Sequence, residues 1–186
     1  MILTGKEIQA RMEAGKIQIS PAPKRINPNS VNLTLGKHLM TYEPSPDAPL
    51  AEQLDFVLDV RKKPAVRNWE IPSTGFILRP GKAYLAATAE YTETHECVPI
   101  LTGRSSVGRL GISVHTSSGL GDIGYCGHWT LHISVIQPVR IYAGFEICQL
   151  VYFDVVGDYD IYTGRYQGSH GIAPSKLHES FDDAVS

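Results

Sequence analysis

The chain has 186 residues, of which 42% are hydrophobic and 19% charged, and its formal net charge is -2. This composition is typical of a globular domain that buries a core, and it does not favour a disordered chain. The small negative charge gives no electrostatic basis for binding nucleic acid or an anionic membrane, so any bound phosphate needs local donors. We expect a single domain over residues 1–186.

Location in the cell is indicated by what the sequence lacks. No apolar run approaches the ~20 residues needed to cross a bilayer. The opening, MILTGKEIQ, lacks the basic and apolar segments of a signal peptide. Cys97, Cys126 and Cys148 are odd in number and scattered, which favours reduced thiols over a disulfide framework. We expect a cytoplasmic protein with no membrane association.

A short helix is predicted at the N-terminus. Thr4 and Glu7 have the spacing of a capping box, in which Thr4 caps and Glu7 reaches back. Ile8 and Met12 share one helix face, and Gly15 is well placed to end the helix.

Strand patterns follow the helix. Val31, Leu33 and Leu35 alternate with polar residues, as in a half-buried strand. Residues 43–75 are richer in proline and charge and predict a long excursion across the surface. Short β-type segments separated by Gly and Pro turns predict a mainly β sandwich or distorted barrel.

The most informative strand covers residues 128–135. Its apolar side chains form one face and its polar side chains the other. The polar face consists of His128, Thr130, His132 and Ser134. Because buried polar groups without partners are costly, this face must meet water or a polar cavity. A second predicted strand over 147–153 surrounds Gln149 with apolar residues, so its amide also needs a partner.

The densest polar cluster is GRSSVGRLG, residues 103–111. Two guanidinium groups, two adjacent hydroxyls and a glycine-permitted backbone suit a polyphosphate cradle. A turn and helix start with solvated arginines is an equal alternative on composition alone, because no Walker-type pattern is present.

A glycine-rich segment follows at residues 117–127. Its glycines would let the backbone approach a ligand, Asp122 offers a carboxylate and Tyr125 a flat ring. A β-hairpin with a solvated aspartate is the alternative, and it is favoured if the segment is taken alone.

Zinc chemistry is not predicted. His128 and His132 are four residues apart on a strand, roughly 13 Å, which is too far to share one ion. The signature of zinc deaminases is absent. We expect hydrogen-bonded or solvated histidines, and His115 packed or at an interface rather than binding a metal.

Six motifs in order give a family resemblance. GRSSVGRLG, DIGYCG, GFEICQLV and GRYQGSHGIAPS closely resemble signatures of dCTP deaminases and bifunctional dCTP deaminase/dUTPases. MILTGKEI and INPNSVNLTLG resemble that family's N-terminal helix and first strand motif. The resemblance spans nearly the whole chain and is least supported between about 40 and 75.

The resemblance implies a mainly β fold, a dUTPase-like distorted β-barrel of the β-clip type. It implies a short N-terminal helix, a C-terminal tail that folds over the nucleotide as a lid, and a homotrimer with active sites between subunits. The implied ligand is a pyrimidine deoxynucleoside triphosphate carrying Mg²⁺, with neither zinc nor nucleic acid involved.

The resemblance also implies roles for individual residues. The expected phosphate-binding residues are Arg104, Ser105, Ser106 and Arg109. Those expected around the nucleoside are Ser117 and Ser118 near the base, Asp122 near the sugar and Tyr125 beneath the deoxyribose, where its ring would leave little room for a 2′-hydroxyl. Further binding residues are Gln149, at phosphate or a neighbouring chain, and Tyr162, Arg165, Tyr166 and Ser169 in the tail. The expected catalytic residues are His132, Asp122, Ser105 and Arg109.

One departure from the family concerns the reaction itself. Deaminases of the family carry a glutamate proton shuttle on the strand after the aspartate motif, and His132 occupies that position. A neutral imidazole can also move protons near pH 7, because its ordinary pKa is about 6.5. His132 is therefore either a substitute shuttle or a sign that deamination is lost.

Three other positions depart from the family pattern. Asn32 stands where an Asp is typical, Glu146 where an Arg is typical and Ser169 where a Gln is typical. An acid near polyphosphate would repel it by about 1 kcal/mol or more, unless it pairs with a changed partner. Arg165 replaces a lysine and keeps the positive charge.

Three functions remain open. Hydrolytic deamination of dCTP to dUTP and ammonia, a step of dUTP biosynthesis, is slightly favoured, with cleavage of the dUTP as an addition. The second is a diphosphatase for dUTP or a modified deoxynucleotide, which needs Asp122 and Tyr125. The third is a nucleotide-binding regulator whose catalytic ability has decayed.

Overall fold

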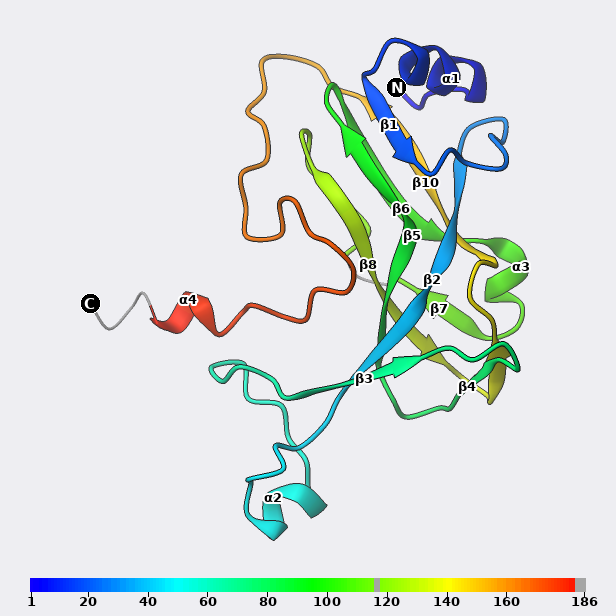
Figure 1. The fold of residues 1–186 in the computed structure, drawn as a ribbon. Helices are drawn as coiled ribbons and strands as arrows, with labels where there is room; N and C mark the ends of the chain where they lie inside the picture. The colour runs from blue at the N-terminus through cyan, green and yellow to red at the C-terminus, as the bar shows by residue number, and fades with distance from the viewer. Residues whose placement is uncertain (116–117, 183–186) are drawn as a thin grey trace.

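A barrel-like β-sheet forms the body of the protein in the computed structural model, which describes residues 1–115 and 118–182 (Figure 1). The strands are β1 (Ile17–Ser20), β2 (Val31–Tyr42), β3 (Val66–Glu70), β4 (Phe76–Leu78), β5 (Tyr84–Thr94), β6 (Cys97–Gly103), β7 (Ile112–Val114), β8 (Cys126–Val135), β9 (Val139–Ile141) and β10 (Glu146–Asp154). The helices are α1 (Gly5–Glu13), α2 (Leu50–Leu54), α3 (Ser105–Gly108) and α4 (Glu179–Asp182).

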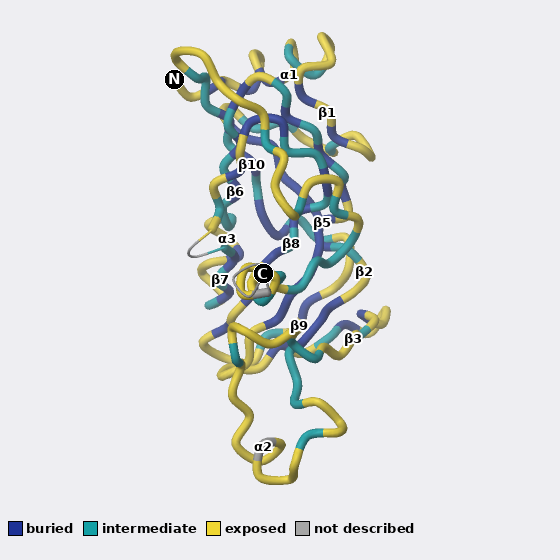
Figure 2. The backbone as a smooth tube through the Cα atoms, turned by 90° about the vertical axis from the view of Figure 1, so that its left-hand side faces the viewer, coloured by how far each residue is buried: buried dark blue, intermediate teal, exposed yellow. Residues whose placement is uncertain are grey.

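The main sheet is antiparallel and nearly closes on itself. Its strands run in the order β6-β10-β2-β5-β8-β7, with β1 added to β5 and β3 added to β2. A small second sheet pairs β4 with β9. Figure 2 shows the buried stretches inside this barrel, with α1 at one end and α2 at the other. The predicted mainly β, barrel-like fold with a short N-terminal helix is confirmed.

The capping box predicted at the start of α1 has two contacts, and the structure forms one of them. The amide of Glu7 donates to Thr4 Oγ1 at 3.3 Å, as an N-cap requires. The Glu7 carboxylate does not reach back, because it accepts from Arg11 Nε at 2.9 Å. Gly15 follows the helix with φ +71°, the left-handed conformation that glycine adopts at low cost.

The prediction that β2 is half buried was wrong. Its first residues are buried on both faces, including Asn32 and Thr34. The Thr34 amide and hydroxyl both donate to the carboxylate of Glu90, at 2.9 and 2.7 Å. These partners inside the barrel make burial of the polar positions tolerable.

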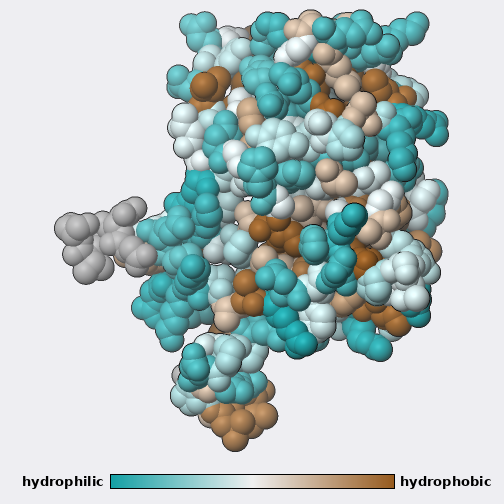
Figure 3. All heavy atoms as spheres, in the orientation of Figure 1, coloured by the Kyte–Doolittle hydropathy of each residue, from teal (hydrophilic) through white to brown (hydrophobic). Residues whose placement is uncertain are grey.

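The predicted surface excursion is shorter than residues 43–75. Within it, β3 pairs with β2, for example Asn68 opposite Met40. β3 is itself largely exposed, and the part that projects from the sheet lies around α2, where Leu50 and Leu54 are 70% and 80% exposed. Figure 3 shows apolar surface at this tip. Across the described residues, no helix is both long and apolar enough to span a membrane. The three cysteines are free, as predicted.

Candidate active site

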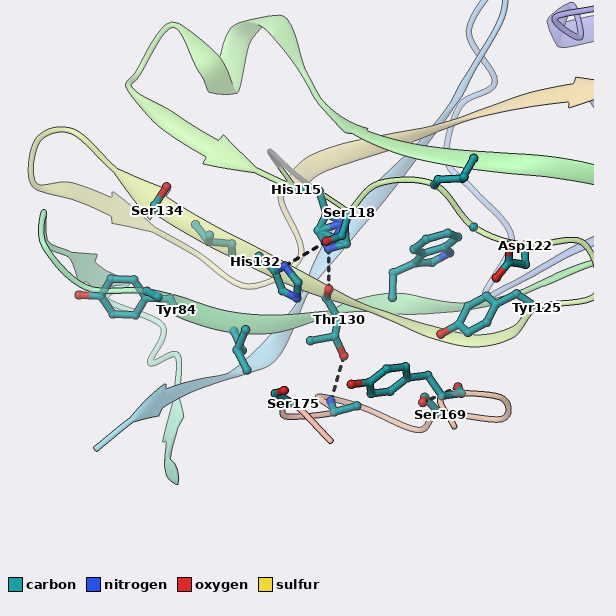
Figure 4. Close-up of a pocket in the computed structure, with 18 of the residues that line it drawn as sticks. Tyr84, His115, Ser118, Asp122, Tyr125, Thr130, His132, Ser134, Ser169 and Ser175 are labelled. Carbon is teal, nitrogen blue, oxygen red and sulfur yellow. Dashed lines mark hydrogen bonds between the residues drawn. The ribbon is translucent and has the colours of Figure 1, made fainter. Parts of the chain in front are cut away.

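A pocket of about 590 Å³ opens between the polar face of β8, the glycine-rich segment before it and the C-terminal tail (Figure 4). Alternation along β8 is as predicted: Trp129, Leu131 and Ile133 are buried, while His132 is exposed to the pocket. The pocket is lined by Tyr42, Ala83, Tyr84, Leu85, His115, Ser118, Leu120, Gly121, Asp122, Tyr125, Trp129, Thr130, His132, Ile133, Ser134, Tyr162, Tyr166, Ser169, Ala173 and Ser175.

Two glycines bring Asp122 to the pocket by packing its segment against β6. The Leu101 amide donates to the Gly119 carbonyl at 2.7 Å, and the Gly121 amide donates to the Pro99 carbonyl at 2.8 Å. A Cβ at Gly119 would lie 2.2 Å from the Leu101 oxygen. We predicted that the glycines of this segment let the backbone approach a ligand. At Gly119 and Gly121 this is wrong, because the backbone there approaches strand β6 instead. The Asp122 side chain is left exposed at the pocket.

Tyr125 forms a fixed wall of the pocket. Its hydroxyl donates to the His128 carbonyl at 2.8 Å. Its ring centroid lies 5.1 Å from that of Trp129 and 6.0 Å from that of Tyr162. Burial raises the pKa of Tyr125 above its ordinary value, so the phenol stays neutral. A ring held in this way presents an apolar surface of constant shape.

Two adjacent histidines lie at the centre of the pocket. His132 Nδ1 lies 3.3 Å from Ser118 Oγ, within hydrogen-bond distance. The ring of His115 lies 4.8 Å from that of His132, and its Nε2 lies 2.6 Å from the Thr130 carbonyl, which can only accept. Burial lowers the pKa of His132, and burial followed by the nearby His132 lowers that of His115 to about 4. Both imidazoles are therefore neutral at pH 7.

The C-terminal tail lines the pocket and is held by its own chain. The His128 amide donates to the Ser169 carbonyl at 2.9 Å, and the Ala173 amide donates to Thr130 Oγ1 at 2.9 Å. These contacts run the tail along the edge of β8. The tail contributes Tyr162, Tyr166, Ser169, Ala173 and Ser175 to the pocket wall (Figure 4).

The predicted site residues divide into two groups. The pocket brings together Ser118, Asp122, Tyr125, His132, Tyr162, Tyr166 and Ser169. The residues that do not line it are Arg104, Ser105, Ser106, Arg109, Gln149 and Arg165. Ser117 lies outside the described residues.

The predicted residues outside the pocket have contacts of their own. Ser105, Ser106 and Arg109 are exposed at α3, which is the predicted turn and helix start. Gln149 accepts from Ser30 Oγ at 2.9 Å, so its expected partner lies within the chain. Arg165 Nη1 donates to the Lys176 carbonyl at 2.7 Å, within the tail.

Some pocket residues were not predicted as site residues. Thr130 and Ser134 had a signal, because they share the alternating polar face with His132. Tyr42 and Tyr84 come from β2 and β5. No sequence pattern indicated them, because only the folded sheet brings their strands to β8. His115 was expected to be packed or at an interface; it is half-buried and also lines the pocket.

The pocket has little charge of its own. Among its described lining residues, Asp122 is the only carboxylate, and no lysine or arginine is present. Within residues 1–115 and 118–182, no three or more His, Cys, Asp or Glu side chains are grouped so as to hold a metal ion. One copy of the chain thus offers a cavity without the cations that a triphosphate requires.

Comparison with known families extends over most of the chain. Residues 2–155 match the model of a family described as dCTP deaminase-like. The chain belongs to the dCTP deaminase-like family. The resemblance carried by the sequence motifs is thereby confirmed.

Similar proteins of this family are named for a particular product. A "dCTP deaminase, dUMP-forming" of Leptospira biflexa is 46% identical over 184 residues, which cover 98% of this chain and 99% of that protein. A protein of the same name from Clostridium acetobutylicum is 47% identical over 184 residues, covering 97% and 99%. These names do not agree with dUTP as the end product that we predicted.

A solved structure shows the same fold. The 2′-deoxycytidine 5′-triphosphate deaminase from Agrobacterium tumefaciens superimposes with a TM-score of 0.59 at 21% identity. The superposition covers 81% of this chain and 47% of that chain, so this chain spans about half of its length.

Proposed function

We propose that the protein hydrolyses dCTP to dUMP, releasing ammonia and diphosphate. The observation that carries this proposal is the single pocket that holds both His132 and Asp122, in a member of the dCTP deaminase-like family. The names of the similar proteins favour dUMP over dUTP as the product.

In the proposed deamination, His132 moves the protons. With its proton on Nδ1, where Ser118 Oγ accepts it, Nε2 keeps a lone pair. Nε2 then takes a proton from a water that adds to C4 of cytosine. The proton is returned to the leaving amino group, the C4–N bond breaks and ammonia departs. The lowered pKa of His132 supports this role, since the ring is neutral at pH 7.

In the proposed second step, Asp122 orients a water for attack on the α-phosphorus. The bond between this phosphorus and the bridging oxygen breaks, and diphosphate leaves with dUMP as the other product. An exposed carboxylate in an otherwise uncharged pocket suits this task, because its oxygens are free to accept hydrogen bonds from water.

The proposed fit of the sugar rests on Tyr125. Its hydroxyl is already engaged by the His128 carbonyl, so it has no donor left for a ribose hydroxyl. A half-buried ring packed on Trp129 cannot move aside without losing that contact. A deoxyribose stacked on this surface is preferred, because an added 2′-hydroxyl would lose water without gaining a partner.

The phosphates are proposed to bind between copies of the chain. A triphosphate needs cationic donors, and the described pocket lining has none. The exposed α3 segment offers Ser105, Ser106 and Arg109, so we infer that a second copy, in a homotrimer, brings this segment to the pocket. Mg²⁺ would arrive bound to the substrate's phosphates, and Asp122 is the one carboxylate that the described pocket lining offers it.

A second candidate is a diphosphatase acting on dUTP without deamination. It is favoured by one observation: the pocket keeps the carboxylate needed for phosphate cleavage, whereas the proton shuttle for deamination is an imidazole. Both candidates use the same nucleotide site.

Product analysis separates the candidates. The protein is incubated with Mg²⁺ and dCTP, dUTP or CTP, and nucleotides, ammonia and diphosphate are each quantified. We expect dUMP, ammonia and diphosphate from dCTP, with CTP converted far more slowly. Diphosphate from dUTP without ammonia from dCTP would establish the second candidate instead. Binding of dCTP without any product would leave only the decayed regulator.

A further inference from the structure

We propose that Glu146 is a positioning residue that fixes Arg104 in the phosphate cradle and also limits the cradle's positive charge. The cradle is defined here as Arg104, Ser105, Ser106 and Arg109. This inference rests on the proposed function in one respect, namely that the cradle binds the phosphates of the substrate.

Glu146 holds the Arg104 guanidinium at two points. Nη1 of Arg104 donates to the Glu146 carbonyl oxygen at 2.8 Å. Nη2 lies 3.0 Å from Glu146 Oε2 in an ion pair. The two contacts together define the plane of the guanidinium, so Arg104 cannot rotate freely. Three of its five N–H groups remain available to an incoming phosphate.

The Glu146 carboxylate is itself held in place. Asn32 Nδ2 donates to the same Oε2 at 3.0 Å, and Asn32 is 4% exposed. Asn32 Oδ1 in turn accepts from Asn27 Nδ2 at 2.8 Å. The pairing of β10 with β2 shifts register between Glu146 and Cys148, an irregularity of the kind that re-aims side chains. Glu146 is therefore directed at Arg104 by the strands themselves.

The network also supports the backbone next to Arg104. Gln149 Nε2 donates to the Gly103 carbonyl at 3.4 Å, and Gln149 Oε1 accepts from Ser30 Oγ at 2.9 Å. Gln149, which we had expected at a phosphate or a neighbouring chain, thus fixes the residue that precedes the cradle.

Charge gives Glu146 its second effect. Its side chain is 25% exposed and that of Arg104 is 28% exposed, so the pair lies at the surface beside the cradle. A carboxylate here cancels the charge of Arg104 and repels phosphate oxygens. Arg109 is then the guanidinium of the described cradle with no carboxylate partner. Glu146 thus fixes Arg104 in position and at the same time lowers the affinity of the cradle for phosphate.

Two substitutions separate position from charge. Glu146→Gln keeps an oxygen that can accept from both Arg104 and Asn32, but it removes the negative charge. Glu146→Asp keeps the charge, but its shorter side chain draws the oxygen away from Arg104. We expect Glu146→Gln to bind inorganic tripolyphosphate and dCTP about fivefold more tightly, with a steeper dependence on salt. We expect Glu146→Asp to bind both more weakly.

The experiment is calorimetric titration of each variant with inorganic tripolyphosphate, at several salt concentrations. Thermal unfolding checks that both variants fold. Opposite shifts in affinity support the proposal, whereas equal shifts, or none, overturn it. Because this probe has no base and needs no turnover, the result stands apart from the product analysis. A protein that does not deaminate dCTP but shows the opposite shifts contradicts the proposed function and not this inference.

Discussion

The imidazole rings of His115 and His132 lie 4.8 Å apart in the pocket, inclined at 49° to one another. Their backbones are also joined, because the His115 amide donates to the His132 carbonyl at 3.0 Å. Protonation of one ring would disfavour protonation of the other, and burial lowers the pKa of both. The centre of the pocket is therefore kept uncharged near neutral pH.

Replacing His132 tests whether an imidazole carries the deamination step. In His132→Ala, ammonia release from dCTP should fall at least about 100-fold, the usual loss when a general acid–base group is removed. Diphosphate release from dUTP should change little, because Asp122 is left in place. Both products are measured on the same samples. Ammonia release at the wild-type rate would exclude His132 as the shuttle.

His115 should make the protein less stable as the pH falls. Its folded pKa is about 4, below the unfolded value of about 6.5. Between these values the unfolded chain binds more protons, so the free energy of unfolding decreases as the pH drops from about 6.5 to about 4. After allowance for partial exposure, the decrease from this group should be roughly 2 kcal/mol.

His115→Asn provides the measurement. Asparagine tolerates the φ of +50° found at this position, so the variant removes the titrating ring without backbone strain. Urea unfolding of both proteins at about pH 8 and about pH 4.5 gives the loss of stability for each. The loss should be smaller in the variant. An equal loss in the two proteins would contradict the assignment.

Asp122 should be required for diphosphate release. Asp122→Asn keeps the shape of an exposed side chain but removes the charge that orients water, so we expect a loss of at least about 100-fold. Asp160→Asn is a matched control, because Asp160 is an exposed carboxylate that lines a neighbouring hollow rather than the pocket. Diphosphate assays with dUTP compare the two variants. Similar activity in both would remove Asp122 from the mechanism.

The tail should contribute to nucleotide affinity through Gln167. Its Nε2 donates to the Gly124 carbonyl at 2.7 Å, and its Oε1 accepts from the Cys126 amide at 2.9 Å. Loss of both bonds in Gln167→Ala should loosen the tail and raise KM about tenfold. Gln137→Ala is the control, since Gln137 makes a single bond to the Leu110 carbonyl at 3.2 Å, away from the pocket. An unchanged KM for Gln167→Ala would show that the tail does not hold the nucleotide.

Features with a local signal could be predicted from the sequence. Period-two alternation revealed the polar face of β8, and with it His132 as a residue that faces a cavity. The Thr4 cap and Gly15 bounded α1, because both signals lie within the helix or next to it. The order of the family motifs indicated the barrel, which no single motif could do.

Features that depend on contacts between distant segments could not be predicted. Residues 66–70 form β3 because they pair with β2. The sequence alone had predicted that they belong to a surface excursion. Position 119 needs a glycine because a Cβ there would clash with the backbone of Leu101 in β6, eighteen positions earlier. Glu146, which departs from the family pattern, pairs with Arg104 just after the end of β6. Only the folded sheet shows that this acidic side chain has a basic partner.

We propose above that the pocket with Asp122 and the exposed Arg109 of a second copy form one site. It is tested by mixing Asp122→Asn and Arg109→Ala, each inactive alone, after unfolding and refolding them together. In a closed ring of randomly mixed subunits, about one quarter of the sites pair an intact pocket with an intact cradle, so about one quarter of wild-type activity should return. No recovery in oligomers shown to contain both variants, or a protein that is monomeric at working concentration, would contradict the account.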